Sequence, residues 1–361
     1  MNIFPSDQLF PIIKIDFDIM SEMVEEICNS GYPFKPSEYW DVLNRINIEQ
    51  LNTYGLNNFK RTVNQNYYNW IPNGFGDNQV KSLISYWAKD PGLMALNAKM
   101  KIPRFFNSII EPENPFLKEE NAEIYRIFVG LLWHYTEKTD HYKIGNKLSE
   151  PELGNAIQIE SEGRLISQDL ANSIRERNAN YDFFDKNPDK THLIAELGAG
   201  CGRLGHVFLE TTKCKYHIFD IPPALMVSQW YLSNLMHDKK VFKFRRFNRF
   251  EDVRNEIELS DIGFFTSNQL ELFPEEYFDS LISVSSLHEM TAEQVDAYKK
   301  IIQKKVGGTV YFKQWINSRN PYLEKQLEKA AYMLDENWEL AIDRIDAIQD
   351  QFFEILFCRK S

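Results

Sequence analysis

The sequence predicts an α/β fold in which a mostly parallel sheet, covered by helices on both faces, follows a mainly helical region. From about residue 190, short apolar runs alternate with amphipathic segments, as strands alternate with helices. Residues 1–185 show helical periodicity instead, and two strand-like segments near 338–346 and 351–358 close the chain as a hairpin. We therefore expect a mainly helical cap or substrate domain over residues 1–185 and a sheet domain over residues 186–361, whose last strand is antiparallel.

The first half contains two clear amphipathic helices. Residues 120–136 place their apolar side chains on one helical face, and residues 78–88 do the same. A short strand pair is expected over residues 155–166, with Glu162-Gly163 as its turn. The apolar positions of the helix over 78–88 are Val80, Leu83, Ile84 and Trp87.

Helix boundaries in the second half are marked by capping residues. One helix is expected from Arg203, and another after Pro222-Pro223, because proline suits the first turn. Thr291 and Gln294 have capping-box spacing and predict a third helix, which Gly307-Gly308 would end. A fourth helix would follow Asn320-Pro321 and carry Leu323, Leu327 and Leu334. The strands between these helices are expected over residues 192–197, 216–221, 262–266, 280–285 and 309–315.

Composition excludes several classes of protein. The 361 residues are 43% apolar and 26% charged, which is typical of a globular protein and not of a disordered one. A net charge of −11 argues against binding nucleic acid or an anionic membrane through the overall field. No apolar run approaches the roughly 18 residues of a membrane span, and the N-terminus does not resemble a signal peptide. The cysteines lack CxxC spacing, so we expect a cytoplasmic protein without zinc or disulfides.

A glycine-rich loop follows the first strand of the second half and precedes a helix. It reads Glu196-Leu-Gly198-Ala-Gly200-Cys-Gly202-Arg-Leu-Gly205. Two interpretations fit these residues. The last three glycines match the dinucleotide-binding fingerprint of NAD(P)-dependent oxidoreductases. The segment from Glu196 to Gly202 resembles motif I of the Rossmann-like methyltransferases that use S-adenosylmethionine (SAM).

Three features favour the methyltransferase interpretation. Glu196 ends an otherwise apolar strand, where a carboxylate is costly unless it is satisfied. The strand meets glycine at Gly198, two residues before the dinucleotide fingerprint begins. The closing hairpin fits the methyltransferase sheet, whose last strand is antiparallel. Asp220, at the end of the second strand, would bind ribose hydroxyls in either interpretation.

The resemblance to methyltransferases implies a set of SAM-binding residues. Glu196 and the loop would hold the methionine part, with Arg203 at its carboxylate, and the segment after the strand over 262–266 would contact adenine. The usual acid is absent there, so Asn268 or Gln269 would take its place, and which amide does so is left open. The complete set is Glu196, Gly198, Ala199, Gly200, Gly202, Arg203, Asp220, Ile221, Ser267, Asn268, Gln269 and Ser285.

A closer resemblance extends from about residue 35 to the end of the chain. The strings that carry it include Phe219-Asp-Ile-Pro-Pro-Ala-Leu, Ser285-Ser-Leu-His-Glu-Met, Phe312-Lys-Gln-Trp and Asn64-Gln-Asn-Tyr-Tyr-Asn-Trp, together with the glycine loop and Ile166-Ser-Gln-Asp-Leu-Ala-Asn-Ser. They are similar to a family of bacterial sugar O-methyltransferases. This resemblance implies a SAM donor, S-adenosylhomocysteine (SAH) as product, and a sugar or glycan hydroxyl as acceptor, often in surface polysaccharide synthesis.

The chemistry of such a transfer points to particular side chains. A sugar hydroxyl needs a general base, for which His288 is the first candidate and Glu289 the second, as the base or as the group that orients the imidazole. Both follow a strand at the edge where ligands of open α/β sheets bind. No aspartate cluster accompanies them, so we expect a reaction without a metal ion. Amide, cationic and aromatic residues expected to bind the acceptor are Lys313, Gln314, Trp315, Asn66 and Tyr67.

Three rival functions remain open at the level of the sequence. The acceptor of a methyltransferase could be a phenolic or lipid-linked metabolite or a protein side chain, and nucleic acid is disfavoured by charge. An NAD(P)-dependent oxidoreductase would use Gly200, Gly202 and Gly205. A protein that keeps the fold only as an interaction module would bind partners without turnover. Helical caps of methyltransferases often pair, which leaves a homodimer open.

Overall fold

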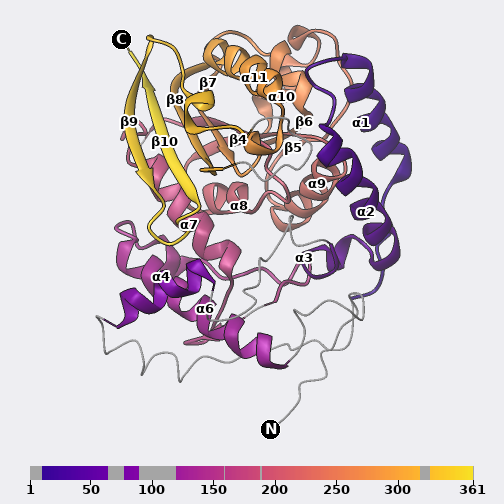
Figure 1. Ribbon diagram of the computed structural model, residues 1–361. Helices are drawn as coiled ribbons and strands as arrows, with labels where there is room; N and C mark the ends of the chain where they lie inside the picture. The colour runs from indigo at the N-terminus through magenta and orange to yellow at the C-terminus, as the bar shows by residue number, and fades with distance from the viewer. Residues whose placement is uncertain are drawn as a thin grey trace. The chain divides into compact units, whose positions relative to one another are not determined.

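The computed structural model describes residues 10–63, 77–88, 119–157, 159–187, 189–317 and 326–360 (Figure 1). The chain forms two compact units that are interleaved in sequence. One, the helical unit, consists of Met1–Ile15, Asn47–Ala179 and Ala347–Asp350. The other, the sheet unit, consists of Asp16–Ile46, Asn180–Asp346 and Gln351–Ser361. No helix of the described residues is long and apolar enough to span a bilayer.

The sheet unit contains an eight-stranded, mostly parallel sheet, which confirms the predicted α/β fold. Its strands pair in the order β5-β6-β4-β3-β7-β8-β10-β9. The pairs from β5 to β8 are parallel, whereas β10 runs antiparallel to both β8 and β9, as the closing hairpin predicts. The bounds are β3 (His192–Leu197), β4 (Cys214–Asp220), β5 (Val241–Phe242), β6 (Ile262–Thr266), β7 (Phe278–Val284), β8 (Val306–Trp315), β9 (Trp338–Ile345) and β10 (Phe352–Arg359).

The helices of the sheet unit begin where the sequence places caps. Thr291 and Gln294 form the expected capping box at the start of α11, and α8 begins at Arg203, directly after the glycine loop. α8 and α9 pack against β4, and α11 packs against β8. Their bounds are α8 (Arg203–Thr211), α9 (Ala224–Leu235), α10 (Arg254–Leu259) and α11 (Ala292–Lys305).

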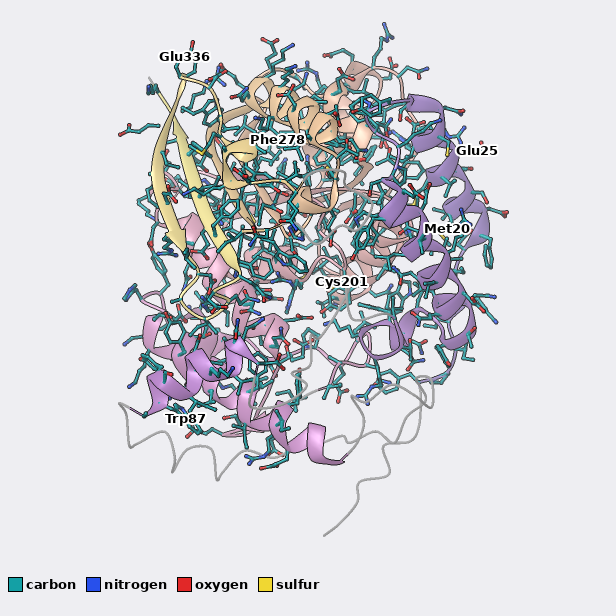
Figure 2. The ribbon with its side chains drawn as sticks, in the orientation of Figure 1. Met20, Glu25, Trp87, Cys201, Phe278 and Glu336 are labelled. Atoms are coloured by element: carbon teal, nitrogen blue, oxygen red, sulfur yellow. The ribbon has the colours of Figure 1, made fainter. Side chains whose placement is uncertain are left out.

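An N-terminal segment, residues 16–46, also belongs to the sheet unit, whereas the sequence-based division places it in the cap domain. It contains α1 (Phe17–Ser30) and the first part of α2 (Glu38–Tyr54). The apolar face of α1, which includes Met20, is buried, and α1 packs against β6, while Glu25 on its other face is exposed (Figure 2). The apolar face of α1 packs against the sheet unit. The position of α1 near the beginning of the sequence does not indicate this.

The helical unit contains α3 (Phe59–Thr62), α4 (Asn78–Trp87), α6 (Glu119–Thr139) and α7 (Gln168–Tyr181). The expected helices over 78–88 and 120–136 are therefore confirmed as α4 and α6, which pack together. The expected hairpin is also present, as β1 (Ile159–Ser161) and β2 (Arg164–Ile166). Its turn places Glu162 and Gly163 at φ +50° and +80°, a conformation that suits glycine at the second position.

Two expectations near the end of the chain are wrong. Gly307 and Gly308 do not end α11; the helix stops at Lys305 and both glycines lie in β8. Residues 318–325, where the fourth helix was expected to begin, lie outside the described residues. From residue 326 to β9, the chain forms a 3₁₀ turn (Lys329–Tyr332) in place of the expected helix, and Leu327 and Tyr332 are buried in the core.

Gly308 is required by a close approach of two strands. A β-carbon at this position would lie 2.3 Å from the carbonyl oxygen of Asp279, where the pairing of β7 and β8 is irregular. We expect Gly308→Ala to lower the free energy of unfolding by about 1–3 kcal/mol, because the backbone must shift. Gly307→Ala is the matched control, since its β-carbon would come no closer than 3.3 Å to Glu276. Urea denaturation measures the free energy of unfolding of both variants. An equal decrease in the two would contradict this explanation.

Candidate active site

The strand order reverses beside β3, the central strand of the parallel part of the sheet. From β3 the chain moves to β4 on one side and later returns to β7 on the other. The loops that follow β3 and β7 therefore leave in opposite directions, which creates the edge where open α/β sheets bind ligands. Asp220 ends β4 at this edge, and the glycine loop, Asn268 and His288 follow β3, β6 and β7 there.

The glycine loop is held in conformations that other residues rarely adopt. Gly198, Gly200 and Gly202 have φ values of +77°, +59° and +81°. At Gly198 space is as restrictive as conformation, because a β-carbon there would lie 2.3 Å from the β-carbon of Ser286. Ser286 also donates a hydrogen bond from its hydroxyl to the carbonyl oxygen of Leu197 (3.1 Å). The loops after β3 and β7 are therefore in direct contact.

The buried carboxylate of Glu196 has a partner within the sheet. Its Oε2 accepts a hydrogen bond from the phenol of Tyr216 on β4 (2.7 Å). Burial, followed by the charge of Glu196, raises the pKa of Tyr216, so the phenol remains a donor. Arg203 is close enough for its charge to oppose that shift. The phenol of Tyr216 thus provides a hydrogen bond that a buried carboxylate at this position needs.

Asp220 fastens the glycine loop to the end of β4. Its Oδ2 accepts a hydrogen bond from the backbone N–H of Gly200 (2.8 Å), and its Oδ1 accepts one from Ile221 (2.7 Å). Burial raises the pKa of Asp220 to about 7, against the lowering effect of hydrogen bonds from the backbone. The backbone of Ala199 supplies a third hydrogen bond. A carboxylate has about four lone pairs, so Asp220 can accept one more hydrogen bond from a ligand.

The structure distinguishes the two amides after β6. Gln269 accepts from the N–H of Thr266 (3.0 Å) and donates to the carbonyl of Arg245 (3.0 Å), so its amide caps a 3₁₀ turn (Ser267–Leu272). Asn268 donates through Nδ2 to Glu26 of α1 (2.9 Å). Its Oδ1 is buried and accepts no hydrogen bond from the residues that the structure describes. Asn268 therefore presents a fixed acceptor.

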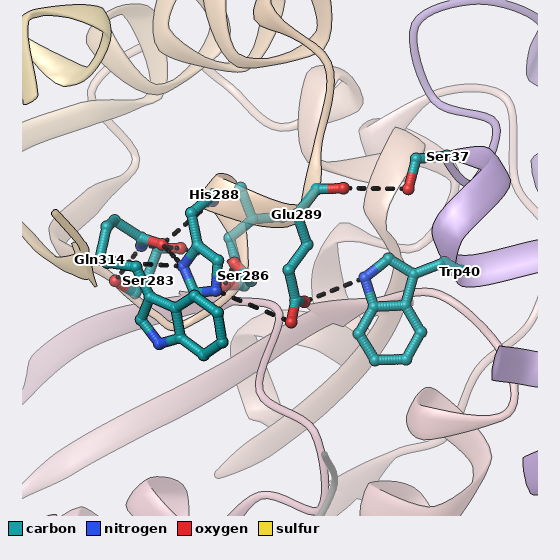
Figure 3. Close-up of polar contacts among 9 residues, drawn as sticks. Ser37, Trp40, Ser283, Ser286, His288, Glu289 and Gln314 are labelled. Carbon is teal, nitrogen blue, oxygen red and sulfur yellow. Dashed lines mark hydrogen bonds and ion pairs between the residues drawn. The ribbon is translucent and has the colours of Figure 1, made fainter. Parts of the chain in front are cut away.

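His288 is held in one tautomer by Gln314 on β8. The Gln314 amide donates to the carbonyl of Ser283 (2.9 Å), which directs its Oε1 toward Nδ1 of His288 (3.0 Å) and toward the His288 backbone N–H (Figure 3). A carbonyl oxygen only accepts, so Nδ1 carries the proton and Nε2 is the basic nitrogen. The longer approach of the Trp315 N–H to Nδ1, at 3.5 Å, is too weak to reverse this assignment. Burial lowers the pKa of His288 to about 4, so the ring is neutral near pH 7.

Glu289 lies between His288 and the N-terminal segment (Figure 3). Its Oε1 is 3.8 Å from Nε2 of His288, and its Oε2 accepts from the indole N–H of Trp40 (3.0 Å). The hydroxyl of Ser37 donates to the Glu289 backbone carbonyl (3.0 Å). Burial raises the pKa of Glu289 to about 8; the hydrogen bond from Trp40 opposes this rise and the charge of Asp220 adds to it. The carboxyl is therefore mostly protonated at neutral pH.

The residues of β8 that were expected to bind an acceptor contact other parts of the protein. Lys313 forms a buried ion pair with Asp346 (2.8 Å). Gln314 orients His288, and the Trp315 ring stacks on the His288 ring with 4.7 Å between centroids. Their contact with an acceptor stays a prediction. Asn66 and Tyr67 lie outside the described residues.

Ser285 directly follows β7, with φ +58°, and precedes Ser286. Gly198 meets Ser286, Gly200 is bonded to Asp220, and Glu196 is bonded to Tyr216. His288 and Glu289 lie side by side on the adjoining loop. No group of three His, Cys, Asp or Glu side chains placed to hold a metal ion occurs among the residues that the structure describes.

Four residues that contact the predicted site residues were not predicted from the sequence: Trp40, Glu26, Tyr216 and Ser286. Trp40 and Glu26 belong to the N-terminal segment and pair with Glu289 and Asn268 across more than two hundred residues. Only the aromatic pair Tyr39-Trp40 after Pro36 marks that segment as unusual, and it does not indicate a partner. Ser286 adjoins the predicted Ser285, and its role depends on the space left by Gly198.

Comparison with known proteins gives similarity only to solved structures. No protein-family model and no curated protein matches this chain. The PH0226 protein of Pyrococcus horikoshii is 11% identical with a TM-score of 0.38, covering 54% of this chain and 92% of its own. Magnesium protoporphyrin IX methyltransferase of Synechocystis with bound SAH gives 11% and 0.37, covering 54% and 86%. The [4+2]-cyclase SpnF gives 13% and 0.34, covering 52% and 80%. Similarity at this level establishes neither an activity nor an acceptor.

The contact between Gly198 and Ser286 can be tested with paired substitutions. We expect Gly198→Ala to lower the thermal midpoint, because the new β-carbon overlaps that of Ser286 and φ is +77°. Ser286→Gly removes the overlapping atom and should recover part of the loss in the double variant. Gly200→Ala has no neighbour within 4 Å and should not respond to Ser286→Gly. Additive effects of Gly198→Ala and Ser286→Gly would contradict the contact.

The raised pKa of Glu289 predicts how stability depends on pH. The folded protein keeps a proton that the unfolded chain has lost, so this stabilisation is complete below the unfolded pKa and is lost as pH rises through about 8. We expect the free energy of unfolding to fall by about 1 kcal/mol per pH unit between roughly pH 6.5 and 8. His288, with a pKa of about 4, does not titrate in this window. Asp220, whose pKa is raised to about 7, does titrate there and adds to the decline.

Glu289→Gln should flatten this decline in denaturation experiments across the same window, leaving the part due to Asp220. Glu293→Gln, an exposed position four residues away, is the matched control and should keep the parent slope. Equal slopes for the parent and Glu289→Gln would show that Glu289 does not retain a proton in the folded state.

Proposed function

We propose that this protein is a cytoplasmic SAM-dependent O-methyltransferase that methylates a sugar hydroxyl in surface polysaccharide or glycan synthesis. The observation that carries the proposal is the meeting, at the switch point of a parallel sheet, of a glycine loop, a fastening carboxylate and a neutral histidine with a defined basic nitrogen. The loop follows β3, Asp220 follows in β4, and His288 follows β7. The resemblance of the sequence strings to bacterial sugar O-methyltransferases supports the acceptor class.

The residues at this edge fit the parts of SAM. The glycine loop and Arg203 at the start of α8 would hold the methionine carboxylate, since backbone N–H groups at a helix start bind anions. Asp220 would accept a hydrogen bond from a ribose hydroxyl. Asn268 would accept one from the adenine amino group at Oδ1, which is buried. The side chain is held in this orientation because its Nδ2 donates to Glu26. When bound, SAM supplies an activated methyl group.

His288 would take the proton of the acceptor hydroxyl at Nε2. As the hydroxyl oxygen bonds to the methyl carbon, the carbon–sulfur bond breaks, its electron pair stays on sulfur, and the proton passes to the imidazole. Gln314 keeps the Nδ1 proton in place, so Nε2 remains the acceptor. The Glu289 carboxyl, 3.8 Å from Nε2, stabilises the resulting imidazolium when it is ionised.

Ligand binding tests the donor. Calorimetry with SAM, SAH and NADH should give micromolar binding of the two adenosyl ligands and none of NADH. Asp220→Ala should weaken both adenosyl ligands at least tenfold, since it removes a ligand of ribose and the fastening of Gly200. Binding of NADH alone would replace the proposal with the oxidoreductase alternative, and unchanged SAM affinity in Asp220→Ala would remove Asp220 from the site.

Turnover tests the base. With an acceptor found by screening sugars, nucleotide sugars and lipid-linked oligosaccharides for SAH release, His288→Ala should lower kcat by about 10²–10⁴-fold. KM for SAM should change little, because His288 is assigned to the acceptor side. Near-parent turnover in His288→Ala would exclude it as the base. Release of SAH with phenolic or protein acceptors but not with any sugar would overturn the acceptor class.

A further inference from the structure

Two carboxyl groups lie near each other at the sheet edge where we propose that SAM binds. Asp220 ends β4, Glu289 follows β7, and the negative charge of Asp220 is near enough to raise the pKa of Glu289. Both acids are largely withdrawn from solvent, so ionising both together is unfavourable. A ligand cation placed between or beside them would relieve that repulsion. The distinctive charge of SAM is such a cation, the sulfonium, which its product SAH lacks.

A side chain of the N-terminal segment determines where the Glu289 carboxyl lies. The Trp40 indole N–H donates to Oε2 of Glu289 at 3.0 Å (Figure 3). An indole N–H donates only, so this contact favours the ionised carboxylate over the protonated acid. The carboxyl is thereby fixed on the side of His288 Nε2 and near Asp220. Ser37, three residues earlier in the same segment, donates to the backbone carbonyl of Glu289.

We propose that Trp40 is a positioning residue that holds the Glu289 carboxyl as the counter-charge by which the site recognises the sulfonium of the methyl donor. The inference rests on the proposed SAM-dependent function and adds to it a means of distinguishing substrate from product. Binding of a sulfonium favours ionised Glu289, so SAM releases a proton that SAH does not. The preference for SAM over SAH should therefore increase as pH rises toward 8.

The other titratable groups around Glu289 do not give the same signature. Asp220 also ionises near neutral pH, but its assigned contact is with ribose, which SAM and SAH share. His288 is neutral throughout this range, with a pKa lowered to about 4. Burial, followed by the charge of Glu289, raises the pKa of Tyr39 on α2 to about 12, so its phenol stays protonated. The Glu289→Gln variant therefore decides whether a difference between SAM and SAH comes from Glu289.

Calorimetric titration of the full chain in two buffers of different ionisation enthalpy measures the protons released. The ligands are SAM, SAH and sinefungin, which carries an ammonium group where SAM carries the sulfonium. At about pH 7 we expect the parent protein to release close to one more proton with SAM or sinefungin than with SAH. Below about pH 8, SAM affinity should rise by up to tenfold per pH unit relative to SAH. Equal proton release with SAM and SAH would overturn the inference.

Variants separate the positioning role from a structural one. Glu289→Gln should abolish the difference in proton release between SAM and SAH. Trp40→Phe keeps the ring but removes the donor, and should move the midpoint of the SAM pH dependence upward by about one pH unit. Ser37→Ala removes a contact with the backbone of the same residue and should leave the midpoint in place.

Equal midpoints in Trp40→Phe and the parent, or equal shifts in Trp40→Phe and Ser37→Ala, would overturn the role of Trp40. Thermal denaturation identifies any variant that fails to fold. If Trp40→Phe does so, Trp40→Gln provides the second measurement: its amide keeps an N–H donor without adding a group that titrates, so it should retain the parent midpoint, and a shifted midpoint would overturn the role of Trp40. The proposed function fails separately, if the parent protein binds none of the three ligands.

Discussion

The contact between Gly198 and Ser286 is the constraint on which the candidate site depends. Strands β3 and β7 are neighbours, yet their following loops lead in opposite directions, so nothing in the strand pairing itself brings the loops together. The absence of a β-carbon at Gly198 lets Ser286 approach. The Ser286 hydroxyl then donates a hydrogen bond to the carbonyl of Leu197 at the end of β3. Asp220, fastened to Gly200, and His288, two residues beyond Ser286, consequently face one edge as parts of a single arrangement.

Burial sets the charge state of this arrangement in a consistent direction. It disfavours every charged form, so it moves the pKa of His288 down and the pKa values of Asp220 and Glu289 up. Near pH 7 these shifts make His288 neutral and Glu289 mostly protonated. Hydrogen bonds then select orientations: Gln314 selects the tautomer of His288, and Trp40 selects the position of Glu289.

Local sequence patterns predicted the features that residues close together in the sequence determine. The turn at Glu162-Gly163, the capping box from Thr291 to Gln294 and the glycine loop all have short-range signatures, and they appear in the structure as expected. Contacts that join distant segments could not be predicted. Trp40 has no periodic relation to Glu289, and Lys313 is buried in a strand only because Asp346 reaches it. Gly307-Gly308 was misinterpreted because glycine serves both a helix end and a close strand approach, and only the position of Asp279 distinguishes them.

The interleaving of the two units has a consequence for how the chain is made. α1, near the beginning of the chain, packs against β6, and the sheet is completed only when β10, near its end, enters between β8 and β9. During synthesis the apolar face of α1 therefore emerges long before its partner, and it remains uncovered until most of the chain has left the ribosome. A ribosome-associated chaperone that shields apolar helices would have its longest task at this first helix.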